Sequence, residues 1–461
     1  LEFASGGGLD AQGYLGATRR FALQFDAGGQ PAEGYVFRRG ALRFGGALPE
    51  FRLDRGVTVD GSLPVLKVDE WLKLARSSAA PVQWNSAFAG AALEVADFSV
   101  FGQQLGSSRI SARRRTDDWQ IEIDSGRIAG TLLVPAQLDR DPRIVAVMRR
   151  LYLNAGNGAS LRELDPRELP GLQLHSDEFA IGSRQLGRLD AEILSDPLGL
   201  RLVSFESMSG SFSAEGSGGW FTGADGDTTR FAVSLSSSDV AATLEELGFD
   251  PVIDAEQAEV TASVFWPGPP SRDWMQHVSG DLALHAETGS LLDVQPGAGR
   301  MVGLLSISAL PRRLALDFRD VFNKGFVFDE ITADFAIIDG DAYTDNLKLS
   351  GPAAEIGVVG RTGLRDRDYR QQAVVTAEPG KMLPTVAGLL AGPGVAAAIL
   401  IFTRIFKEPL KGIGRASYCV TGSWQEPVVE RLTPEQLEQG ELCAELPPGA
   451  ATASQAGVAA R

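Results

Sequence analysis

Three histidines, His175, His277 and His285, are the first residues of this sequence to consider for chemistry. Imidazoles can ligate zinc, but a metal site needs further ligands at short, regular spacings. None of the three has such partners in the sequence, although His277 and His285 could approach each other across a hairpin. We therefore expect a structural role for each histidine, and we predict no metal site.

Paired carboxylates offer a second kind of chemistry, because two acids that flank a bond can hydrolyse a glycoside. Asp317 and Asp320 are close enough in sequence to form such a pair. Arg312, Arg313 and Arg319 lie next to them, and this mixture of charges is typical of a solvated face with salt bridges. A hydrolytic site is the less favoured interpretation of these residues.

Other catalytic motifs are weak or missing. The segment Gly297-Ala-Gly-Arg-Met-Val-Gly303 resembles a dinucleotide-binding fingerprint, but its third glycine is misplaced and no strand–turn–helix pattern surrounds it. The sequence contains neither a Gly-x-Ser-x-Gly motif nor a phosphate-binding Gly-x-x-x-x-Gly-Lys loop. These observations predict a protein that is not an enzyme and that uses no cofactor.

The two cysteines, Cys419 and Cys443, could form one disulfide that ties the C-terminal segment to a strand. Cys419 lies in the strand-like run Tyr418-Cys-Val-Thr-Gly-Ser-Trp424. In an oxidising compartment, closing this loop would stabilise the fold by about 3 kcal/mol in the loop-entropy model. Two free thiols are the alternative.

Composition excludes several functional classes. The chain has 461 residues, with 43 Lys and Arg against 59 Asp and Glu, and a formal charge of −16. This acidic balance argues against nucleic acid as a partner, since phosphate binding relies on clustered basic residues. Two cysteines are too few for a disulfide-dense miniprotein or a zinc ribbon. The chain begins at Leu1 without a signal peptide, and we interpret it as a piece of a longer protein.

A period of two in the apolar residues is the dominant pattern, and it predicts a mainly β chain. Several alternating runs end in turn residues, such as Asp339-Gly340. Consecutive strands with short turns predict a long, twisted antiparallel sheet with one apolar face. The residues expected to line that face are Phe231, Val233, Leu235, Val260, Val264, Leu282, Leu284, Leu314, Leu316, Phe318, Phe335, Ile337, Leu347, Leu349, Ile356 and Val358. The pattern does not separate residues that face a groove from residues of a closed core.

Helical periodicity is confined to a few short segments. Residues 68–76 have acids in the first turn, and residues 238–248 begin with Ser and Asp and stop at Gly248. A third short helix is expected near residues 141–153. We expect residues 1–236 to form one β segment that includes the first and third helices, and residues 237–424 a second. Residues 425–461 are expected to form a final strand and a disordered tail.

An apolar sheet face must be covered, and the predicted helices are too few to cover this one. Two sheets could stack as a sandwich, or the sheet could close into a barrel. It could also curl into a U-shaped groove, whose exposed apolar lining would cause aggregation unless an apolar ligand filled it. Lipid is the expected ligand of such a groove.

Residues 383–406 form the least ordinary segment of the chain. The segment is apolar, but Gly392-Pro393-Gly394 divides it into two pieces that are each too short to span a bilayer, so we expect a helical hairpin. Basic residues cluster beside it, which suits contact with anionic lipid headgroups; a buried plug is the alternative. The residues expected to contact a membrane are Leu389, Leu390, Ile399, Leu400, Phe402, Arg404, Lys407 and Lys411.

A series of motifs in the second half of the chain resembles the AsmA-like family. It includes Gly303-Leu-Leu-Ser306, Leu310-Pro-Arg-Arg-Leu314, Asp317-Phe-Arg-Asp-Val-Phe322, Lys324-Gly-Phe-Val-Phe-Asp329 and the closing Tyr418-x-Val-Thr-Gly-Ser-Trp424. Upstream, Trp266-Pro-Gly-Pro269 fits the same pattern. The resemblance is specific over residues 237–430 and only general over residues 1–236.

The resemblance implies a periplasmic protein of Gram-negative bacteria, anchored in the inner membrane by an N-terminal helix that is absent from this chain. Members of the family are long, repeating β-groove proteins thought to carry phospholipids between the inner and outer membranes. The 383–406 hairpin would lie at the outer-membrane end. The Cys419/Cys443 pair is not part of the family pattern, so the disulfide is inferred from the sequence alone.

These observations together predict a bridge-type lipid transfer protein that works without chemistry. Acyl chains would lie in the apolar groove, where burial of each methylene contributes about 0.8 kcal/mol, and headgroups would stay in water. Two alternatives remain open. One is an envelope scaffold with a closed β core and no lipid. The other is a carbohydrate enzyme with a cluster of carboxylates, such as Asp334, Asp339 and Asp341, on one exposed face.

Overall fold

The computed structural model describes residues 2–3, 8–15, 18–28, 36–45, 55–70, 88–136, 143–155, 164–271, 273–292, 326–352, 354–377, 415–438 and 443–447. These residues form 23 strands and a few short helices, so the prediction of a mainly β chain is confirmed. The chain divides into two compact units. Unit 1 comprises Leu1–Gly182 and Gly187–Val203, and unit 2 comprises Ser183–Leu186 and Ser204–Arg461. This division does not coincide with the boundary expected between residues 236 and 237.

Unit 1 is built from strands that pair with their neighbours in sequence. Its strands are β1 (Glu2–Phe3), β2 (Gly8–Leu15), β3 (Thr18–Gly28), β4 (Val36–Phe44), β5 (Gly56–Lys67), β6 (Phe88–Val100), β7 (Gln103–Arg114), β8 (Asp118–Ser125), β9 (Ile128–Pro135), β10 (Arg143–Leu153) and β11 (Gly171–Ile181). Two further strands, β12 (Arg184–Asp196) and β13 (Gly199–Met208), contribute residues to both units.

Three strand pairings in the described part of unit 1 are parallel, whereas the sequence predicted an antiparallel sheet. They join β4 to β5, β5 to β6 and β10 to β11. A parallel pair cannot be closed by a tight turn, because the chain must return to the same end of the sheet. The connections between these strands are accordingly long, and the last of them contains the short 3₁₀ helix η2 (Pro166–Glu168).

The prediction of a helix near residues 141–153 is wrong, because Arg143–Leu153 form strand β10. The strand is paired on both sides, antiparallel to β9 and parallel to β11. Ala146 and Met148, two residues apart, are both buried, as the period of a strand requires. Tertiary pairing thus overrides the local helical pattern. Of the helix expected at residues 68–76, Val68–Glu70 are helical, and the rest lies outside the described residues.

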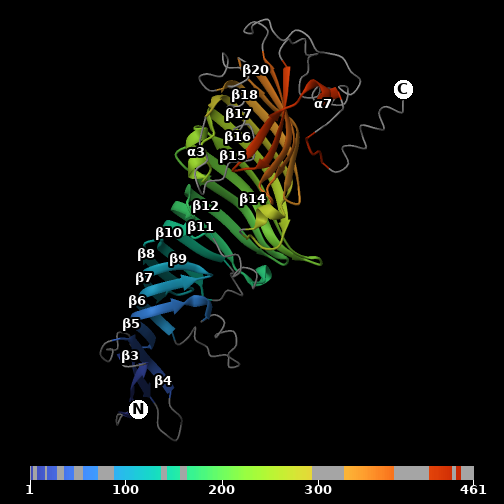
Figure 1. Ribbon diagram of the computed structural model, residues 1–461. Helices are drawn as coiled ribbons and strands as arrows, with labels where there is room; N and C mark the ends of the chain where they lie inside the picture. Colours follow the sequence, from blue (N-terminus) through green and yellow to red (C-terminus); the bar gives the residue numbers. More distant parts are fainter. Residues whose placement is uncertain are drawn as a thin grey trace. The chain divides into compact units, whose positions relative to one another are not determined.

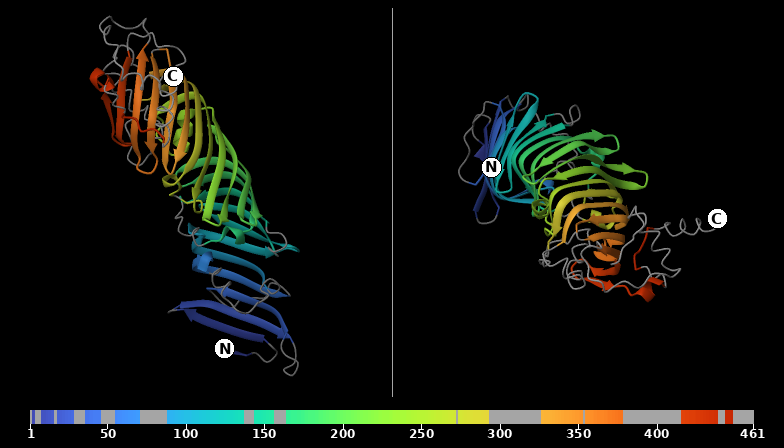
Figure 2. Two further views of the ribbon diagram at one scale, coloured as in Figure 1. Left: turned by 90° about the vertical axis from the view of Figure 1, so that its right-hand side faces the viewer. Right: turned by 90° about the horizontal axis from the view of Figure 1, so that it is seen from above.

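Unit 2 contains a single antiparallel sheet in which each strand from β14 to β23 pairs with the next. The strands are β14 (Phe212–Gly223), β15 (Gly226–Ser237), β16 (Ile253–Pro267), β17 (Ser279–Leu291), β18 (Phe326–Ile338), β19 (Asp341–Ser350), β20 (Ala354–Gly363), β21 (Asp368–Ala377), β22 (Arg415–Ser423) and β23 (Pro427–Arg431). Figures 1 and 2 show this order as a progression from green to red. The described strands of unit 2 therefore do not form the two stacked sheets of a sandwich.

Local sequence explains the turns and helices of unit 2. Asp339 and Gly340 both have positive φ angles, 44° and 83°, and form the expected tight turn between β18 and β19. The helix expected at residues 238–248 is confirmed as α3 (Val240–Glu246), which lies beside β16 (Figure 1). Asp239 caps it by accepting a hydrogen bond from the Ala242 N–H at 3.0 Å.

Two further helical turns in unit 2 were not expected from the sequence. They are η3 (Trp274–Gln276), before β17, and α7 (Pro434–Glu438), after β23. The final strand expected beyond residue 425 is β23, and the tail beyond residue 447 lies outside the described residues. Within the part of the chain that is described, no helix is long and apolar enough to span a membrane.

Candidate functional site

Strand register places the described members of the predicted lining on one face of the unit 2 sheet. Phe231 lies opposite Val264, and Leu282 lies opposite Phe335. The pairing continues across β19 and β20, where Leu349 lies opposite Ile356. We call this side of strands β15 to β22 the apolar face. Its other members from the predicted set are Val233, Leu235, Val260, Leu284, Ile337, Leu347 and Val358.

The apolar face has two parts that differ in exposure. In β15, β16 and β17, which we call the open part, side chains such as Val233, Val260 and Leu282 are only half-buried. In β18 to β22, the closed part, the apolar face is buried throughout, with Leu347 1% exposed and Leu349 fully buried. The change occurs between the adjacent strands β17 and β18. Within the described residues of this face, the accessible apolar surface therefore lies in the open part.

An aromatic cluster flanks one end of the open part. The Phe231 and Trp266 rings lie 5.8 Å apart and are stacked, and the Trp274 ring lies 5.3 Å from Trp266. The Trp266 indole N–H donates to the Pro269 carbonyl at 3.1 Å, within the Trp-Pro-Gly-Pro motif. Trp274 comes from η3, which no periodicity in the sequence predicted. The cluster packs with the core of unit 2 and borders the accessible apolar surface.

The opposite face of the open part is polar and exposed. One register row runs through Ala232, Ser263, Asp281 and Ala336, and all four side chains are exposed. Each lies next in sequence to a residue of the apolar face, as alternation along a strand requires. Apart from Phe265, which is 49% exposed on the opposite face, the large apolar side chains of these strands therefore lie on one side of the sheet, as the sequence predicted.

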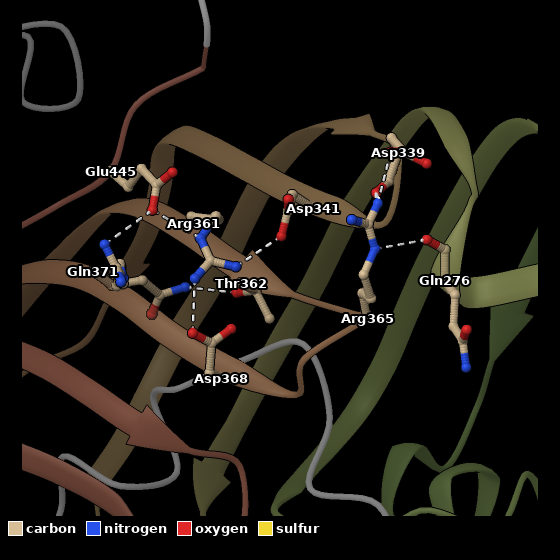
Figure 3. Close-up of polar contacts among 10 residues, drawn as sticks. Gln276, Asp339, Asp341, Arg361, Thr362, Arg365, Asp368, Gln371 and Glu445 are labelled. Atoms are coloured by element: carbon tan, nitrogen blue, oxygen red, sulfur yellow. Dashed lines mark hydrogen bonds and ion pairs between the residues drawn. The ribbon is translucent and has the colours of Figure 1, made fainter.

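At the closed part, a buried arginine joins strands that are distant in sequence. Arg361 of β20, whose side chain is 7% exposed, forms ion pairs with Asp341 and Asp368 at 2.7 Å and with Glu445 at 3.0 Å (Figure 3). Burial alone would lower the pKa of its guanidinium, but hydrogen bonds and charge from Asp368 and Asp341 raise that pKa above its usual value. The arginine therefore stays charged and pairs with three carboxylates.

A second polar contact in the same view joins the turns between strands. Arg365 donates to the Gln276 carbonyl at 3.1 Å and forms an ion pair with Asp339 at 2.7 Å (Figure 3). This ion pair lowers the pKa of Asp339. Asp339 and Asp341 are thus engaged in separate structural contacts.

Residues 443–447, which we call the C-terminal strap, are fastened to the closed part at several points. Cys443 forms a disulfide with Cys419 of β22, with Cα atoms 5.9 Å apart. The Glu445 N–H donates to the Arg370 carbonyl at 3.1 Å, in addition to the Glu445 ion pair with Arg361. The presence of just two cysteines in the sequence pointed to this pair, but nothing in the sequence pointed to Glu445 as a partner of Arg361.

The histidines have separate acidic partners. His175 Nδ1 lies 2.6 Å from Asp190, and the hydrogen bond to this carboxylate raises the pKa of His175. His277 contacts Asp339 at 3.4 Å, whereas His285 contacts Glu287 at 3.0 Å. Among the residues that the structure describes, no group of His, Cys, Asp and Glu could hold a metal ion.

Unit 1 has its own one-sided apolar cluster. Its buried members include Val95, Phe98, Ile128 and Met148, and half-buried leucines and isoleucines pack against them. Register again places successive members on one face, as where Ile110 lies opposite Ile123. The same strand pattern therefore builds an apolar face in both units.

Several predicted site residues lie outside the described residues. They are Leu314, Leu316 and Phe318 of the predicted lining, and Leu389, Leu390, Ile399, Leu400, Phe402, Arg404, Lys407 and Lys411 of the predicted membrane contact. Asp317 and Asp320 lie outside them as well. The roles assigned to these residues stay predictions.

Comparison with known proteins identifies relatives of this chain. It is 24% identical over 394 residues to the intermembrane phospholipid transporter YhdP of Escherichia coli (strain K12), an alignment that covers 81% of this chain and 30% of that protein. The chain thus spans less than a third of the length of this relative. No solved structure matches the chain. The family model described as YhdP protein matches residues 7–429, and the chain therefore belongs to the YhdP family.

Proposed function

We propose that unit 2 binds phospholipid acyl chains along the open part of its apolar face, as one segment of a longer protein that moves phospholipids between membranes. The observation that carries this proposal is the row of half-buried aliphatic side chains on β15 to β17. The name of the E. coli relative, an intermembrane phospholipid transporter, supports the same ligand.

The physical basis is burial of hydrocarbon without chemistry. Each methylene that leaves water contributes about 0.8 kcal/mol, so a few methylenes per strand suffice to hold an acyl chain. An apolar face left in water would promote association with other apolar surfaces, and a bound lipid removes that risk. A bound lipid therefore stabilises the open part, and the accessibility of this surface allows one lipid to replace another.

Headgroups play little part in binding at this surface. Apart from Thr229 and Ser237 near the ends of β15, the alternating positions of the open part carry mainly aliphatic or aromatic residues, such as Val233, Val260 and Leu284, and no charged group. Without a polar anchor, lipids of different headgroups bind with similar affinity and can move from strand to strand. Transfer needs many near-equivalent sites rather than one tight site.

The envelope setting is part of the same proposal. We place the full-length protein in the periplasm, with an inner-membrane anchor before this segment and its C-terminal end toward the inner leaflet of the outer membrane. The apolar segment 383–406 and the basic residues beside it would contact that leaflet. The E. coli relative is named as an intermembrane transporter, which supports a position between two membranes.

Photo-crosslinking at paired positions tests lipid binding. A photoreactive amino acid replaces Val233, on the apolar face, or its neighbour Ala232, on the exposed polar face. The protein is produced in the bacterial envelope, irradiated and purified in mild detergent, and its mass is measured. We expect phospholipid adducts at Val233 and none at Ala232. Adducts at neither position, or equally at both, would contradict the proposal.

A scaffold function is the second candidate, and the closed part favours it. There the apolar face is fully buried and offers no surface to lipid. A scaffold whose core is closed throughout would purify without lipid. Native mass spectrometry separates the two functions, since a lipid-free mass together with absent crosslinks at Val233 would support the scaffold.

A further inference from the structure

A cavity of about 940 Å³ crosses strands β13 to β19 of unit 2. Each of these strands contributes three consecutive residues, such as Ala232, Val233 and Ser234 of β15. The middle residue of the triplets in β15 to β18 belongs to the apolar face, so the two outer residues point to the opposite, polar face. Pro447 of the C-terminal strap also lines it. The cavity is thus a trough on the polar face, and we call it the carboxylate trough.

The charged residues that line the carboxylate trough are all acidic. Glu206, Glu215, Asp281 and Asp334 lie along it, and no Lys, Arg or His is among its lining residues. The carboxylates of Glu206, Glu215 and Asp281 have no hydrogen-bond or ion-pair partner among the described residues. Most other lining residues are Ser, Thr, Ala or Gly, whose small side chains leave the trough open.

Tyr343 adds an unpaired group that points to a ligand. Its side chain lines the carboxylate trough, although the residue is only 7% exposed. Its hydroxyl has no hydrogen-bond partner in the part of the chain that is described. The hydroxyl is therefore available to a molecule that binds in the trough.

The spacing of the carboxylates fits an extended ligand. Asp281 lies opposite Ala336, so Asp334 is its diagonal neighbour, about 7 Å away. Glu215 lies in the same register row as Asp334, four strands away, which corresponds to about 19 Å across the sheet. Alternate side chains of an extended peptide are spaced by about 7 Å, so lysines at every second position would place several ammonium groups along this row. A single metal ion would not span them.

We propose that the carboxylate trough is a docking site for an extended, lysine-rich segment of a partner protein. Lysine ammonium groups pair with Glu215, Asp281 and Asp334, and a backbone or side-chain group of the peptide pairs with the Tyr343 hydroxyl. The peptide lies across the strands on the face opposite to the one proposed to bind lipid. A partner could therefore be bound while the apolar face is occupied.

Peptide binding by the purified protein tests the proposal. The probe is a dye-labelled peptide of alternating lysine and serine, titrated at physiological ionic strength and followed by fluorescence anisotropy. The double variant Glu215→Gln, Asp281→Asn should bind about fivefold more weakly, because two exposed ion pairs are lost. Tyr343→Phe, which keeps the ring, should weaken binding about twofold.

A matched control separates this site from general attraction to an acidic protein. Asp254→Asn with Glu430→Gln removes the same charge from exposed positions outside the carboxylate trough, and it should leave binding unchanged. Equal weakening by both double variants, or no binding by the original protein, would overturn the proposal. So would full displacement of the peptide by Mg²⁺ alone, which would indicate a cation site. Lipid crosslinking at Val233 should not change in the trough variants.

Discussion

The open and closed parts of the apolar face share strand register and residue type, yet they differ in what they can bind. Leu282 of β17 and Leu349 of β19 lie on the same face, and Leu282 is half-buried whereas Leu349 is fully buried. The open part consists mainly of Val, Leu and Ala, while the closed part adds Phe328, Tyr369 and Tyr418. Pairing of strands makes an apolar face, but packing decides whether a ligand can reach it.

In the closed part, the face of the sheet opposite to the apolar face also contains buried residues. Val359 and Val374 lie on the side opposite to the apolar face and are at most 1% exposed. The Arg361 ion pairs and the Cys419–Cys443 disulfide lie on this side too. Strands buried on both faces resemble a layered core rather than a binding surface. The closed part thus provides rigidity at one end of a sheet whose other strands stay accessible.

The largest expected effect comes from placing a charge in each part of the apolar face. Leu349→Asp should destabilise unit 2 by more than about 4 kcal/mol, because an unpaired carboxylate would be buried. Leu282→Asp, the matched variant in the open part, should cost about 1 kcal/mol and instead reduce the phospholipid that co-purifies. Urea unfolding followed by tryptophan fluorescence measures both. Similar losses of stability would remove the distinction between the two parts.

Removal of the buried guanidinium should have the next largest effect. Arg361→Met leaves three carboxylates without their shared partner and should lower the free energy of unfolding by about 3 kcal/mol. Arg370→Met, at a side chain that is 62% exposed, should cost less than about 0.5 kcal/mol. Hydrogen exchange should rise in β20 and β21 of the first variant and not in β15 to β17. Increased exchange in all these strands would mean that the two parts unfold together.

Loss of the disulfide should loosen the C-terminal strap by a somewhat smaller amount. Cys443→Ser opens a link across a sequence separation of 24 residues and should cost about 2 to 3 kcal/mol in the loop-entropy model. Thermal unfolding of this variant, and of the original protein with and without a dithiol, gives the measurement. Lipid crosslinking at Val233 should persist. Its loss would indicate that the strap also maintains the open part.

The smallest expected effect is an alkaline pH dependence that belongs to the closed part. Burial raises the pKa of Tyr369 above its ordinary value, so the folded state favours the neutral phenol. This contribution is fully present below pH 10 and declines by at most about 1.4 kcal/mol per pH unit above it. Tyr369→Phe should reduce that decline. Urea unfolding between neutral pH and pH 11 measures it, and an unchanged slope would contradict this assignment.

The sequence predicted the sheet well because alternation is a local property. The alternation of Phe231, Val233 and Leu235 identifies the apolar face within a few residues. Strand pairing then aligns the apolar residues of β15 to β20 on that same face. The pattern at residues 141–153 failed because Arg143–Leu153 fits both a helix and a strand, and only its neighbours β9 and β11 decide between them. Local patterns identify strands best where the apolar residues fit the two-residue period of a strand and do not also fit the 3.6-residue period of a helix.

Exposure and long-range polar contacts could not be predicted in the same way. Leu282 and Leu349 have the same local pattern, and alternation does not encode how far each side chain is buried. Arg361 and Glu445 are 84 residues apart, with no spacing rule that links them. The aromatic partner of Trp266 comes from η3, whose three residues are too short for a periodic signal. The candidate site was therefore predicted as a face and not as a set of accessible residues.

Pairing of each strand with its predecessor also bears on how unit 2 forms during synthesis. From β14 to β17 every new strand finds its partner immediately upstream, so contacts close short loops and folding has a low contact order. Such a sheet can grow strand by strand from its N-terminal side as successive parts of the chain become available for folding. The pairing of β21 with β22 must instead bridge residues 378–414, and Cys443 follows later still. The open part can therefore assemble before the closed end is locked, so a nascent chain needs protection of its apolar face before its last strands exist.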